Sequence, residues 1–279
     1  MAKIQEFDTK QAIAESNRLI RNMFNSTFTK RQMDLIYAVI SLVKPEDDEF
    51  TEYVITYEAI GKIFNPANPD CTVTIKDIEK AVKGIMNKSF QMEDEEWIEY
   101  FHYVKNAKLN KKTKTLKFKI DDEVKPFYLE LKKGKYTSFL LKDILALSTT
   151  FQMNLFRWLA CNAGFNNDII IPIEDAKIHF YGKEIETKGL VRKIDSALEV
   201  INQRTNINAT YEKITNGRKI TGLKFTIDNK YIKPVKQKTP AQIKAEQERS
   251  KAMWERNLEL EKEIAELKAQ LERKNQEAV

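Results

Sequence analysis

The segment between residues 171 and 227 constrains the fold of this chain most, because helical and strand patterns follow one another in it directly. The apolar run Asp168–Pro172 predicts a strand at its start, and residues 173–181 predict a short helix. Thr187 stands where an N-cap belongs, before a longer helix over residues 188–201. The apolar stripe of that helix has helical spacing and comprises Leu190, Ile194, Leu198 and Ile201.

Two alternating runs, at residues 207–211 and 220–227, predict a β-hairpin with its turn at Asn216-Gly217. Helix, turn, helix and hairpin, in this order, are typical of a winged helix-turn-helix. Such a module lays one helix in the major groove, where the N-terminal residues of that helix reach the base edges. We therefore interpret this part of the chain as a DNA-binding domain.

Basic side chains lie where such a module would meet DNA. An Arg guanidinium can pair with both acceptors of a guanine, whereas a Lys ammonium acts as a point charge on phosphate. A single basic residue of this kind more often belongs to the solvated face of an ordinary helix. The combination of several such residues with a basic hairpin favours DNA binding. The candidate DNA-contacting residues of this domain are Lys188, Arg192, Lys193, Ser196, Arg204, Arg218 and Lys219.

The first half of the chain repeats this order of elements. Thr29 with Gln32, and Thr74 with Asp77, have capping-box spacing, which predicts that helices begin there. The second of these helices has an apolar stripe of Ile75, Ile78, Val82, Ile85 and Met86. Its opposite face is predicted to be basic and to contact DNA through Lys76, Lys80, Lys83 and Asn87. Strand-like runs follow at residues 88–92, 97–104 and 115–120.

The predicted fold class is therefore α+β, with two tandem winged helix-turn-helix domains followed by a helical tail. The expected organisation is a flexible N-terminus at 1–15, domains at 16–130 and 131–228, a basic linker at 229–240 and a C-terminal helix at 241–279.

A heptad pattern in the tail predicts a coiled-coil seam, with a lone Asn257 at an a position, where Asn specifies register and dimers. Because the pattern spans barely three heptads, a solitary amphipathic helix remains the alternative. The seam residues are Met253, Asn257, Leu260, Ile264, Leu267 and Leu271.

The composition of the 279 residues fits a chain with a polyanionic partner. The formal net charge is +6, and 42% apolar residues are enough for two small cores. Two cysteines, Cys71 and Cys161, do not suggest a disulfide framework or a metal site. Neither a signal core nor a run of about eighteen apolar residues is present, so we expect a cytoplasmic protein without membrane contact.

The sequence favours binding over catalysis. It contains no G-x-x-x-x-G-K-[ST] pattern for a nucleotide-binding loop. The two histidines, His102 and His179, lie far apart and do not form the His-x-His pair of a nickase. The acidic pairs Asp47-Asp48 and Asp121-Asp122 are typical of solvated turns. We expect no catalytic residue, no metal and no cofactor.

Four segments carry a family likeness: Ser16–Ile20, residues 32–43, Leu155–Leu159 and residues 192–212, which include the pattern Ile-Asn-x-x-Thr-Asn-Ile at 201–207. With these segments the chain resembles the iteron-binding, theta-type plasmid replication initiators, and the similarity covers residues 16–228. The resemblance implies two winged-helix domains that bind directly repeated sites in double-stranded DNA at a plasmid origin. It also implies opening of an AT-rich flank, recruitment of a host initiator and helicase, and a bacterial cytoplasmic location; many family dimers repress their own promoter.

Two other functions remain open at this point. A dimeric winged-helix transcriptional repressor would use the same two domains and the tail, and would prefer inverted repeats. A replication enzyme, either a nickase or a primase-like factor, is the more distant alternative and would relax supercoiled plasmid in the presence of divalent metal.

Overall fold

The computed structural model describes residues 4–22, 28–44, 47–65, 73–93, 96–129, 131, 135–163, 168–181 and 185–229. The predicted linker beyond Asn229 and the predicted tail, with its seam of Met253, Asn257, Leu260, Ile264, Leu267 and Leu271, lie outside the described residues.

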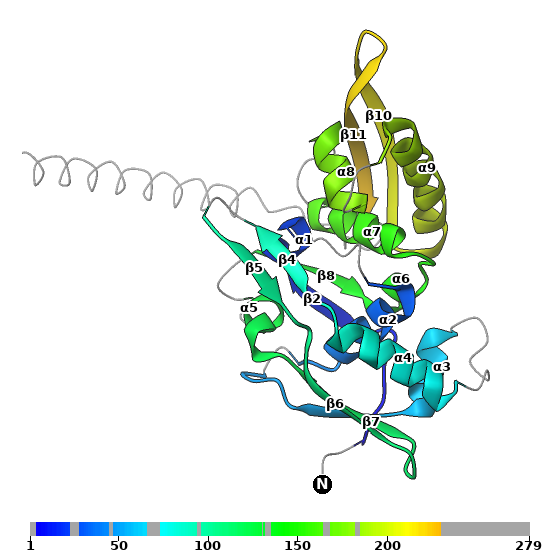
Figure 1. The fold of residues 1–279 in the computed structure, drawn as a ribbon. Coiled ribbons are helices and arrows are strands. Elements are labelled where there is room, and N and C mark those ends of the chain that lie inside the picture. The colour runs from blue at the N-terminus through cyan, green and yellow to red at the C-terminus, as the bar shows by residue number, and fades with distance from the viewer. Residues whose placement is uncertain are drawn as a thin grey trace, which may run out of the picture. The chain divides into compact units, whose positions relative to one another are not determined.

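The first part of the chain alternates short strands and helices (Figure 1). Its strands are β1 (Ile4–Gln5), β2 (Ala12–Ser16), β3 (Glu52–Thr56), β4 (Phe90–Glu93), β5 (Ile98–Phe101), β6 (Val104–Asn110), β7 (Thr115–Ile120) and β8 (Tyr136–Leu140). Its helices are α1 (Asn17–Asn22), α2 (Lys30–Ile40), α3 (Tyr57–Phe64), α4 (Ile75–Met86), α5 (Lys125–Tyr128) and α6 (Leu141–Leu145), with a 3₁₀ turn at Asp122–Val124.

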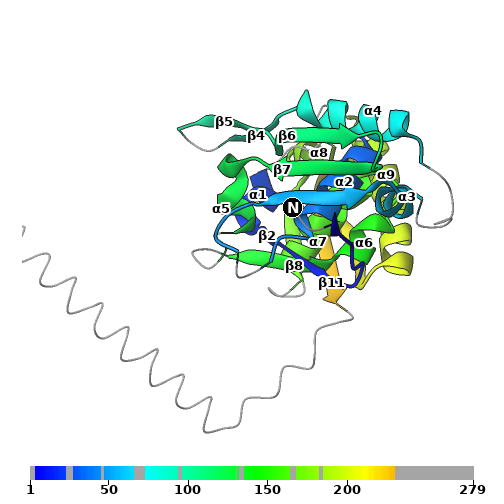
Figure 2. The ribbon, with the colours of Figure 1, turned by 90° about the horizontal axis from the view of Figure 1, so that it is seen from below.

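The strands among the described residues of this part form three sheets. The largest has the order β1-β3-β7-β6, in which β1 runs parallel to β3 and the other pairs are antiparallel. Figure 2 shows β3, β7 and β6 side by side. β2 pairs with β8, and β4 pairs with β5.

In its described residues, the second part has three helices and a three-stranded sheet (Figure 1). Its elements are α7 (Thr150–Asn162), β9 (Asp168–Pro172), α8 (Ile173–Tyr181), α9 (Thr187–Arg204), β10 (Ile207–Asn216) and β11 (Lys219–Asn229). The sheet has the order β10-β11-β9, all antiparallel, so β10 and β11 extend as a hairpin beyond β9.

Both predicted capping boxes are confirmed. The Thr29 side chain accepts from the Gln32 amide, and the Gln32 side chain accepts from the Thr29 amide at 2.9 Å. Thr74 and Asp77 make the same reciprocal pair, with both bonds at 3.2 Å. These bonds satisfy N–H groups that the first helical turn leaves without a partner, so they fix where α2 and α4 begin.

The N-terminus differs from the prediction. Residues 1–15 were expected to be flexible, but β1 and most of β2 lie within them. Ile13 is 1% exposed and the β2 backbone pairs with β8 over its full length. Two short strands have too few residues for periodicity to reveal them, and their pairing partners lie far along the chain.

The expected domain boundary after residue 130 also differs from the structure. β8 pairs with β2, and α6 packs against α2, so residues 136–145 belong structurally with the first part of the chain. The sequence Lys132-Lys133-Gly134-Lys135 is polar and contains glycine, which is typical of a linker, but it precedes β8, another strand of the first part.

Candidate nucleic-acid interface

Helix α9 packs its predicted apolar stripe against the domain and exposes its other face. The helix begins at Thr187, one residue before the predicted start, so Thr187 is not the N-cap. Glu186 occupies that position and makes no side-chain capping bond. The helix also continues to Arg204. Its buried residues are Leu190, Val191, Ile194, Ala197, Leu198 and Ile201.

The charges on the exposed face of α9 are unevenly distributed. Lys188, Arg192 and Lys193 lie in the N-terminal half, and the exposed acidic residues Asp195 and Glu199 follow them. The N-terminal end of a helix also carries a partial positive charge and unpaired N–H groups. The beginning of α9 is therefore suited to an anion.

The predicted DNA-contacting residues of α9 differ in their surroundings. Arg192 and Ser196 lie one turn apart on the exposed face. The Lys193 ammonium lies 5.2 Å from the centre of the Tyr181 ring and 6.0 Å from that of Phe151, which attracts it toward α7 and α8.

Arg204 lies at the opposite end of α9 from Lys188. Its Nη1 donates to the carbonyl oxygen of Ala146 at 3.4 Å. Because α9 rises about 1.5 Å per residue, Arg204 is about 24 Å along the helix from Lys188. Arg204 is therefore separated from the basic cluster with which the sequence grouped it.

The joint between α9 and β10 explains the Ile-Asn-x-x-Thr-Asn-Ile pattern. The Asn202 side chain donates to the Ala209 carbonyl oxygen at 2.9 Å and accepts from the Ala209 amide at 2.8 Å. The Thr205 hydroxyl donates to the Ile201 carbonyl oxygen at 2.8 Å and accepts from the Ile207 amide at 3.2 Å. These side chains replace the missing backbone partners where the helix ends, so they fix the hairpin relative to α9.

A second contact braces the hairpin against the middle of α9. The Tyr211 hydroxyl on β10 donates to the Asp195 carboxylate at 2.6 Å. Burial raises the pKa of Tyr211 well above its ordinary value, and the hydrogen bond to Asp195 raises it further. The phenol therefore stays protonated, and helix and hairpin are held as one unit.

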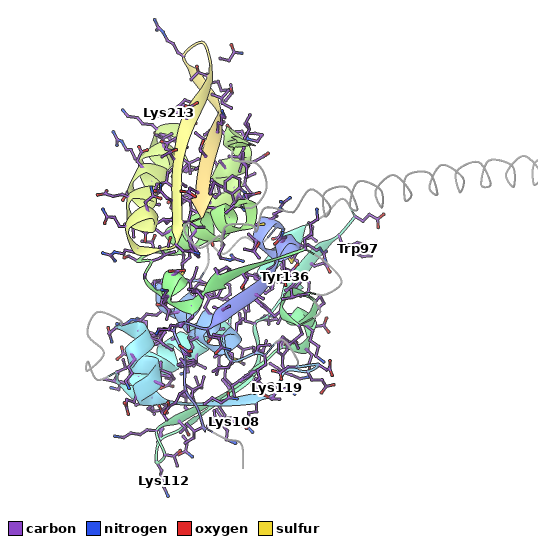
Figure 3. All side chains as sticks on the ribbon, turned by 180° about the vertical axis from the view of Figure 1, so that it is seen from behind. Trp97, Lys108, Lys112, Lys119, Tyr136 and Lys213 are labelled. Atoms are coloured by element: carbon purple, nitrogen blue, oxygen red, sulfur yellow. The ribbon has the colours of Figure 1, made fainter. Side chains whose placement is uncertain are left out.

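The β10–β11 hairpin presents its basic residues at its tip. Asn216 pairs with Lys219, so the turn is Gly217-Arg218 rather than Asn216-Gly217. Gly217 has φ +60°, a conformation that Gly adopts without strain. Arg218 and Lys219 are exposed, as expected for a wing. Lys213 is also exposed on β10 (Figure 3), and the sequence analysis missed it because the predicted strand ended at Tyr211.

Helix α4 is less uniformly basic than predicted. Lys76, Lys80, Lys83 and Asn87 are all exposed, and Asn87 is the C-cap. The same surface carries Glu79, whose carboxylate pairs with the Lys83 ammonium at 3.0 Å. Met86, predicted in the buried stripe, is 37% exposed because the helix ends there.

The β6–β7 hairpin carries a lysine cluster that the sequence analysis missed. This hairpin follows α4 and the short β4–β5 pair along the chain, and its strand β6 packs against α4. Lys108 lies directly opposite Lys117, and Asn106 lies opposite Lys119. Figure 3 shows Lys108, Lys112 and Lys119 on this hairpin. In the sequence, this hairpin is indicated by the polar turn from Asn110 to Lys114 between two alternating runs.

One carboxylate partly compensates this cluster. The Lys117 ammonium pairs with the Glu52 carboxylate at 2.9 Å. This hydrogen bond is the main reason why the pKa of Glu52 lies below its ordinary value, and the nearby Lys108 and Lys119 lower it further. Like charges directly opposite one another destabilise a strand pair. A polyanion over this face would relieve that repulsion.

The aromatic residues divide into two groups. Trp158, predicted to be core, is 6% exposed and packs edge-to-face on Phe180 and Phe225. Trp97 precedes β5 and is 68% exposed, and Tyr100 on β5 is 66% exposed. The sequence around them carries the carboxylates Glu93, Asp94, Glu95, Glu96 and Glu99, so it is unfavourable for a phosphate backbone.

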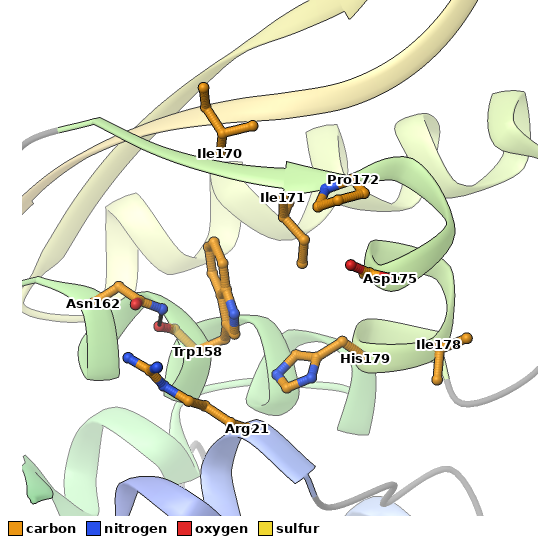
Figure 4. A pocket seen from close by; sticks show the side chains of 9 residues that line it. All are labelled: Arg21, Trp158, Asn162, Ile170, Ile171, Pro172, Asp175, Ile178 and His179. Carbon is orange, nitrogen blue, oxygen red and sulfur yellow. Dashed lines mark hydrogen bonds between the residues drawn. The ribbon is translucent and has the colours of Figure 1, made fainter. Parts of the chain in front are cut away.

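A cavity of about 420 Å³ lies between α1 and the elements α7, α8 and β9 (Figure 4). Trp158 and isoleucine side chains form most of its wall, with Arg21, Asn162, Asp175 and His179 at its polar positions. Burial, with Arg157 and Arg21 nearby, lowers the pKa of His179 to about 4, so its ring is neutral at pH 7. None of the predicted DNA-contacting residues lines this cavity.

Within the described ranges, no group of three or more His, Cys, Asp and Glu side chains is arranged to hold a metal ion. His102 instead bonds through Nδ1 to the Lys88 carbonyl at 3.1 Å. No helix in the part of the chain that the structure describes is long and apolar enough to cross a membrane.

Comparisons with known proteins agree with this architecture. A family model described as "Initiator Replication protein, WH1" matches residues 12–160, more than half of the chain. A second, described as "Initiator Rep protein, WH2", matches residues 191–227. The fold is thus that of two winged-helix domains. None of the curated proteins matches the chain in sequence.

Solved structures with a similar fold include the Pi initiator protein in complex with iteron DNA, with a TM-score of 0.64 and 17% sequence identity. That match covers 79% of this chain and 98% of the Pi chain. Domains 2 and 3 of RctB match with a TM-score of 0.45 and 10% identity, over 82% of this chain and 94% of that one.

Proposed function

The chain belongs to the initiator replication protein family, and from this membership we propose that it initiates plasmid replication by binding directly repeated sites in double-stranded DNA. The observation that carries the proposal is the position of Lys188 and Arg192 at the start of α9, beside a hairpin whose tip carries Arg218 and Lys219. The Pi initiator, which shares the fold, was solved with iteron DNA, and this supports the choice of ligand.

In the proposed complex, the N-terminal half of α9 enters a major groove. Arg192 pairs with a guanine edge, and Lys188 and Lys193 neutralise phosphates. The β10–β11 tip lies along the backbone or in the neighbouring minor groove. The bonds from Asn202 and Tyr211 support this arrangement, because they fix the hairpin relative to the helix.

The first domain contacts a second major groove about one helical turn away. Lys76, Lys80 and Lys83 of α4 face that groove, and the lysines of the β6–β7 hairpin add attraction that does not depend on sequence. Arg204, bonded to Ala146 at the far end of α9, is assigned to the domain interface in this arrangement rather than to a base.

The further steps follow from bound arrays and not from covalent chemistry. Arrays of the protein bend and strain the flanking DNA, which favours opening where stacking is weak. A host initiator and helicase are the expected protein partners, and the location of plasmid DNA places the chain in the bacterial cytoplasm. The heptad pattern of residues 253–271 supports a dimer through the tail, with Asn257 setting its register.

The decisive experiment selects bound sites from random duplex DNA and then footprints the recovered motif in direct and inverted arrangements. An asymmetric motif of about two helical turns, bound best as direct repeats, is expected. A palindromic motif bound only by a dimer would instead identify a repressor. Unchanged permanganate reactivity of an AT-rich flank beside a fully bound array, in supercoiled DNA, would rule out unaided opening.

A further inference from the structure

Helix α7 is shared by both domains. All of its side chains from Gln152 to Leu159 are buried, which places the helix inside the molecule rather than on its surface. One side packs on the first domain, where Phe156 meets Phe139 of β8 edge-to-face at 5.7 Å. The other packs on the second domain, where Trp158 meets Phe225 of β11 at 5.3 Å.

A fully buried ion pair fastens α7 to the first domain. Arg157 of α7 donates from Nε to the Glu15 carboxylate of β2 at 2.8 Å, and the two side chains are 2% and 0% exposed. The second oxygen of Glu15 accepts the Tyr128 hydroxyl at 3.0 Å. The Arg157 guanidinium also lies 5.9 Å from the centre of the Tyr37 ring on α2.

Such a buried ion pair contributes more to the orientation of the helix than to the free energy of unfolding. Removing two charges from water is costly, and well-packed apolar replacements are often as stable. Apolar contacts, however, allow a helix to rotate or slide, whereas a charge-assisted bond to a planar guanidinium holds one geometry. The pair is thus suited to setting an angle.

The contacts continue from this pair to the two candidate recognition helices. On one side, α9 packs on α7 itself. On the other, α4 packs on α2, which carries Tyr37. The approach of α4 to α2 is close, since a Cβ on Gly84 would come within 1.9 Å of the side-chain nitrogen Nε2 of Gln32. A continuous path of packed elements therefore joins α9 to α4 through Arg157.

We propose that Glu15 and Arg157 are positioning residues, which fix the orientation of α9 relative to α4 so that the chain accepts only one spacing between the DNA segments that its two domains contact. The inference rests on the proposed function, because it requires both domains to bind the same duplex. Each added base pair turns the second segment by about 34–36° and moves it about 3.4 Å, and a rigid reader cannot follow both changes.

The test compares affinities for the selected site and for versions with one, two or five base pairs inserted between its two footprinted segments. The proteins are the full-length chain and its Arg157→Met, Glu15→Gln and doubly substituted variants. Glu58→Gln serves as a control, because it breaks an exposed ion pair, to Lys62 at 2.8 Å, on α3. Each variant is first checked for cooperative thermal unfolding.

For the wild-type chain and for Glu58→Gln, we expect the insertion of one base pair and the insertion of two base pairs each to weaken binding by about tenfold or more. For the Arg157 and Glu15 variants, we expect that penalty to shrink to about threefold, with weaker binding at the original spacing. If a single variant does not fold, the double variant decides, because it leaves no unpaired buried charge.

A folded variant that keeps the full spacing penalty would overturn the inference and leave the ion pair with a structural role only. A wild-type chain that binds its site specifically but shows no spacing penalty would overturn the two-groove arrangement itself. A wild-type chain without specific binding would overturn the proposed function. The three failures are therefore distinguishable.

Discussion

Arg192 and Arg204 carry the same charge on one helix in different surroundings. Arg192 is exposed beside the start of α9, whereas Arg204 donates to the Ala146 carbonyl oxygen at the end of it. Only the first is free to reach a base edge in the proposed complex. The two residues therefore provide a matched pair for separating sequence recognition from general charge.

Arg192→Ala is expected to weaken binding to the selected site by about 1–3 kcal/mol and to change binding to unrelated duplex little. The reason is the loss of a bidentate contact to a base edge. Arg204→Ala is the control, with the same charge change and a small effect on the specific site. Titrations on both duplexes at one salt concentration measure the difference. An equal loss on both duplexes would assign Arg192 to phosphate instead.

His179 makes stability depend on pH. Its pKa in the folded chain is lowered to about 4, first by burial and then by Arg157 and Arg21, from an ordinary value of 6.5. Between these values the unfolded chain binds a proton that the folded chain does not. The contribution of neutral His179 to the free energy of unfolding is therefore complete above pH 6.5 and is lost as the pH falls toward 4.

The free energy of unfolding that the chain loses through His179 amounts to about 3 kcal/mol at pH 4. Denaturant unfolding of the wild-type chain and His179→Gln at pH 7.5, 6, 5 and 4.5 measures it. We expect the stability of the wild-type chain relative to the variant to decrease steadily over this series. A constant difference between the two proteins would show that His179 titrates alike in the folded and unfolded chains.

Among the elements, the β10–β11 turn depends on one backbone conformation. Gly217 has φ +60°, and an added Cβ would meet no atom of the described residues within 4 Å. Gly217→Ala should therefore cost about 1–2 kcal/mol through backbone strain alone, and Gly217→Asn less, because Asn tolerates this conformation. Gly189→Ala, inside α9 and without a close clash, should stabilise by about 0.5–1 kcal/mol. Chemical denaturation of the three variants compares them.

If Gly217→Ala proved as stable as the wild-type chain, the turn would have to adopt another conformation in solution. A loss of stability in Gly189→Ala would mean that Ile185, 3.4 Å from the added Cβ, cannot adjust. Denaturation is followed without DNA, so these measurements report on folding alone.

Local signals predicted the elements that depend on nearby residues. Thr29, Thr74 and the stripe of α9 act within one or two turns, and each is found where the sequence places it. The predicted N-cap of α9, Thr187, is wrong by one residue, because Glu186 occupies the N-cap position and makes no side-chain capping bond. Helix ends are less sharply encoded than helix interiors.

Long-range pairings were not predictable in this way. β2 is five residues long and pairs with β8, so neither strand has a recognisable partner nearby. The same limit hid the lysine cluster of the β6–β7 hairpin, because Lys108 and Lys117 become neighbours only through register. Of the candidate site, the basic start of α9 and the tip of its hairpin followed from sequence, whereas the displaced Arg204 required the structure.

At the scale of the whole molecule, the proposed complex should depend strongly on salt. The chain has a formal net charge of +6, and exposed lysines are present on both hairpins. The logarithm of the binding constant should fall linearly with the logarithm of salt concentration, by about 0.9 for each neutralised phosphate.

Lys112→Ala, in the turn of the β6–β7 hairpin, should reduce that slope by about 1 without changing sequence preference. Lys44→Ala is a suitable control, because it removes the same charge outside the candidate interface. Titrations over a range of salt concentrations on specific and unrelated duplexes test both variants. Identical slopes for the wild-type chain and Lys112→Ala would exclude this hairpin from the bound surface.

The pairing of β2 with β8 also affects how the chain is made. Ala12 finds its partner at Leu140, and Glu15 finds its partner at Arg157. At usual rates of translation, the ribosome needs on the order of ten seconds to synthesise the intervening residues. During that interval the nascent first domain has an unpaired strand edge and a carboxylate without its counter-ion, so it cannot finish folding before synthesis of the second begins. Premature termination before α7 should therefore yield an aggregation-prone fragment rather than a smaller working protein.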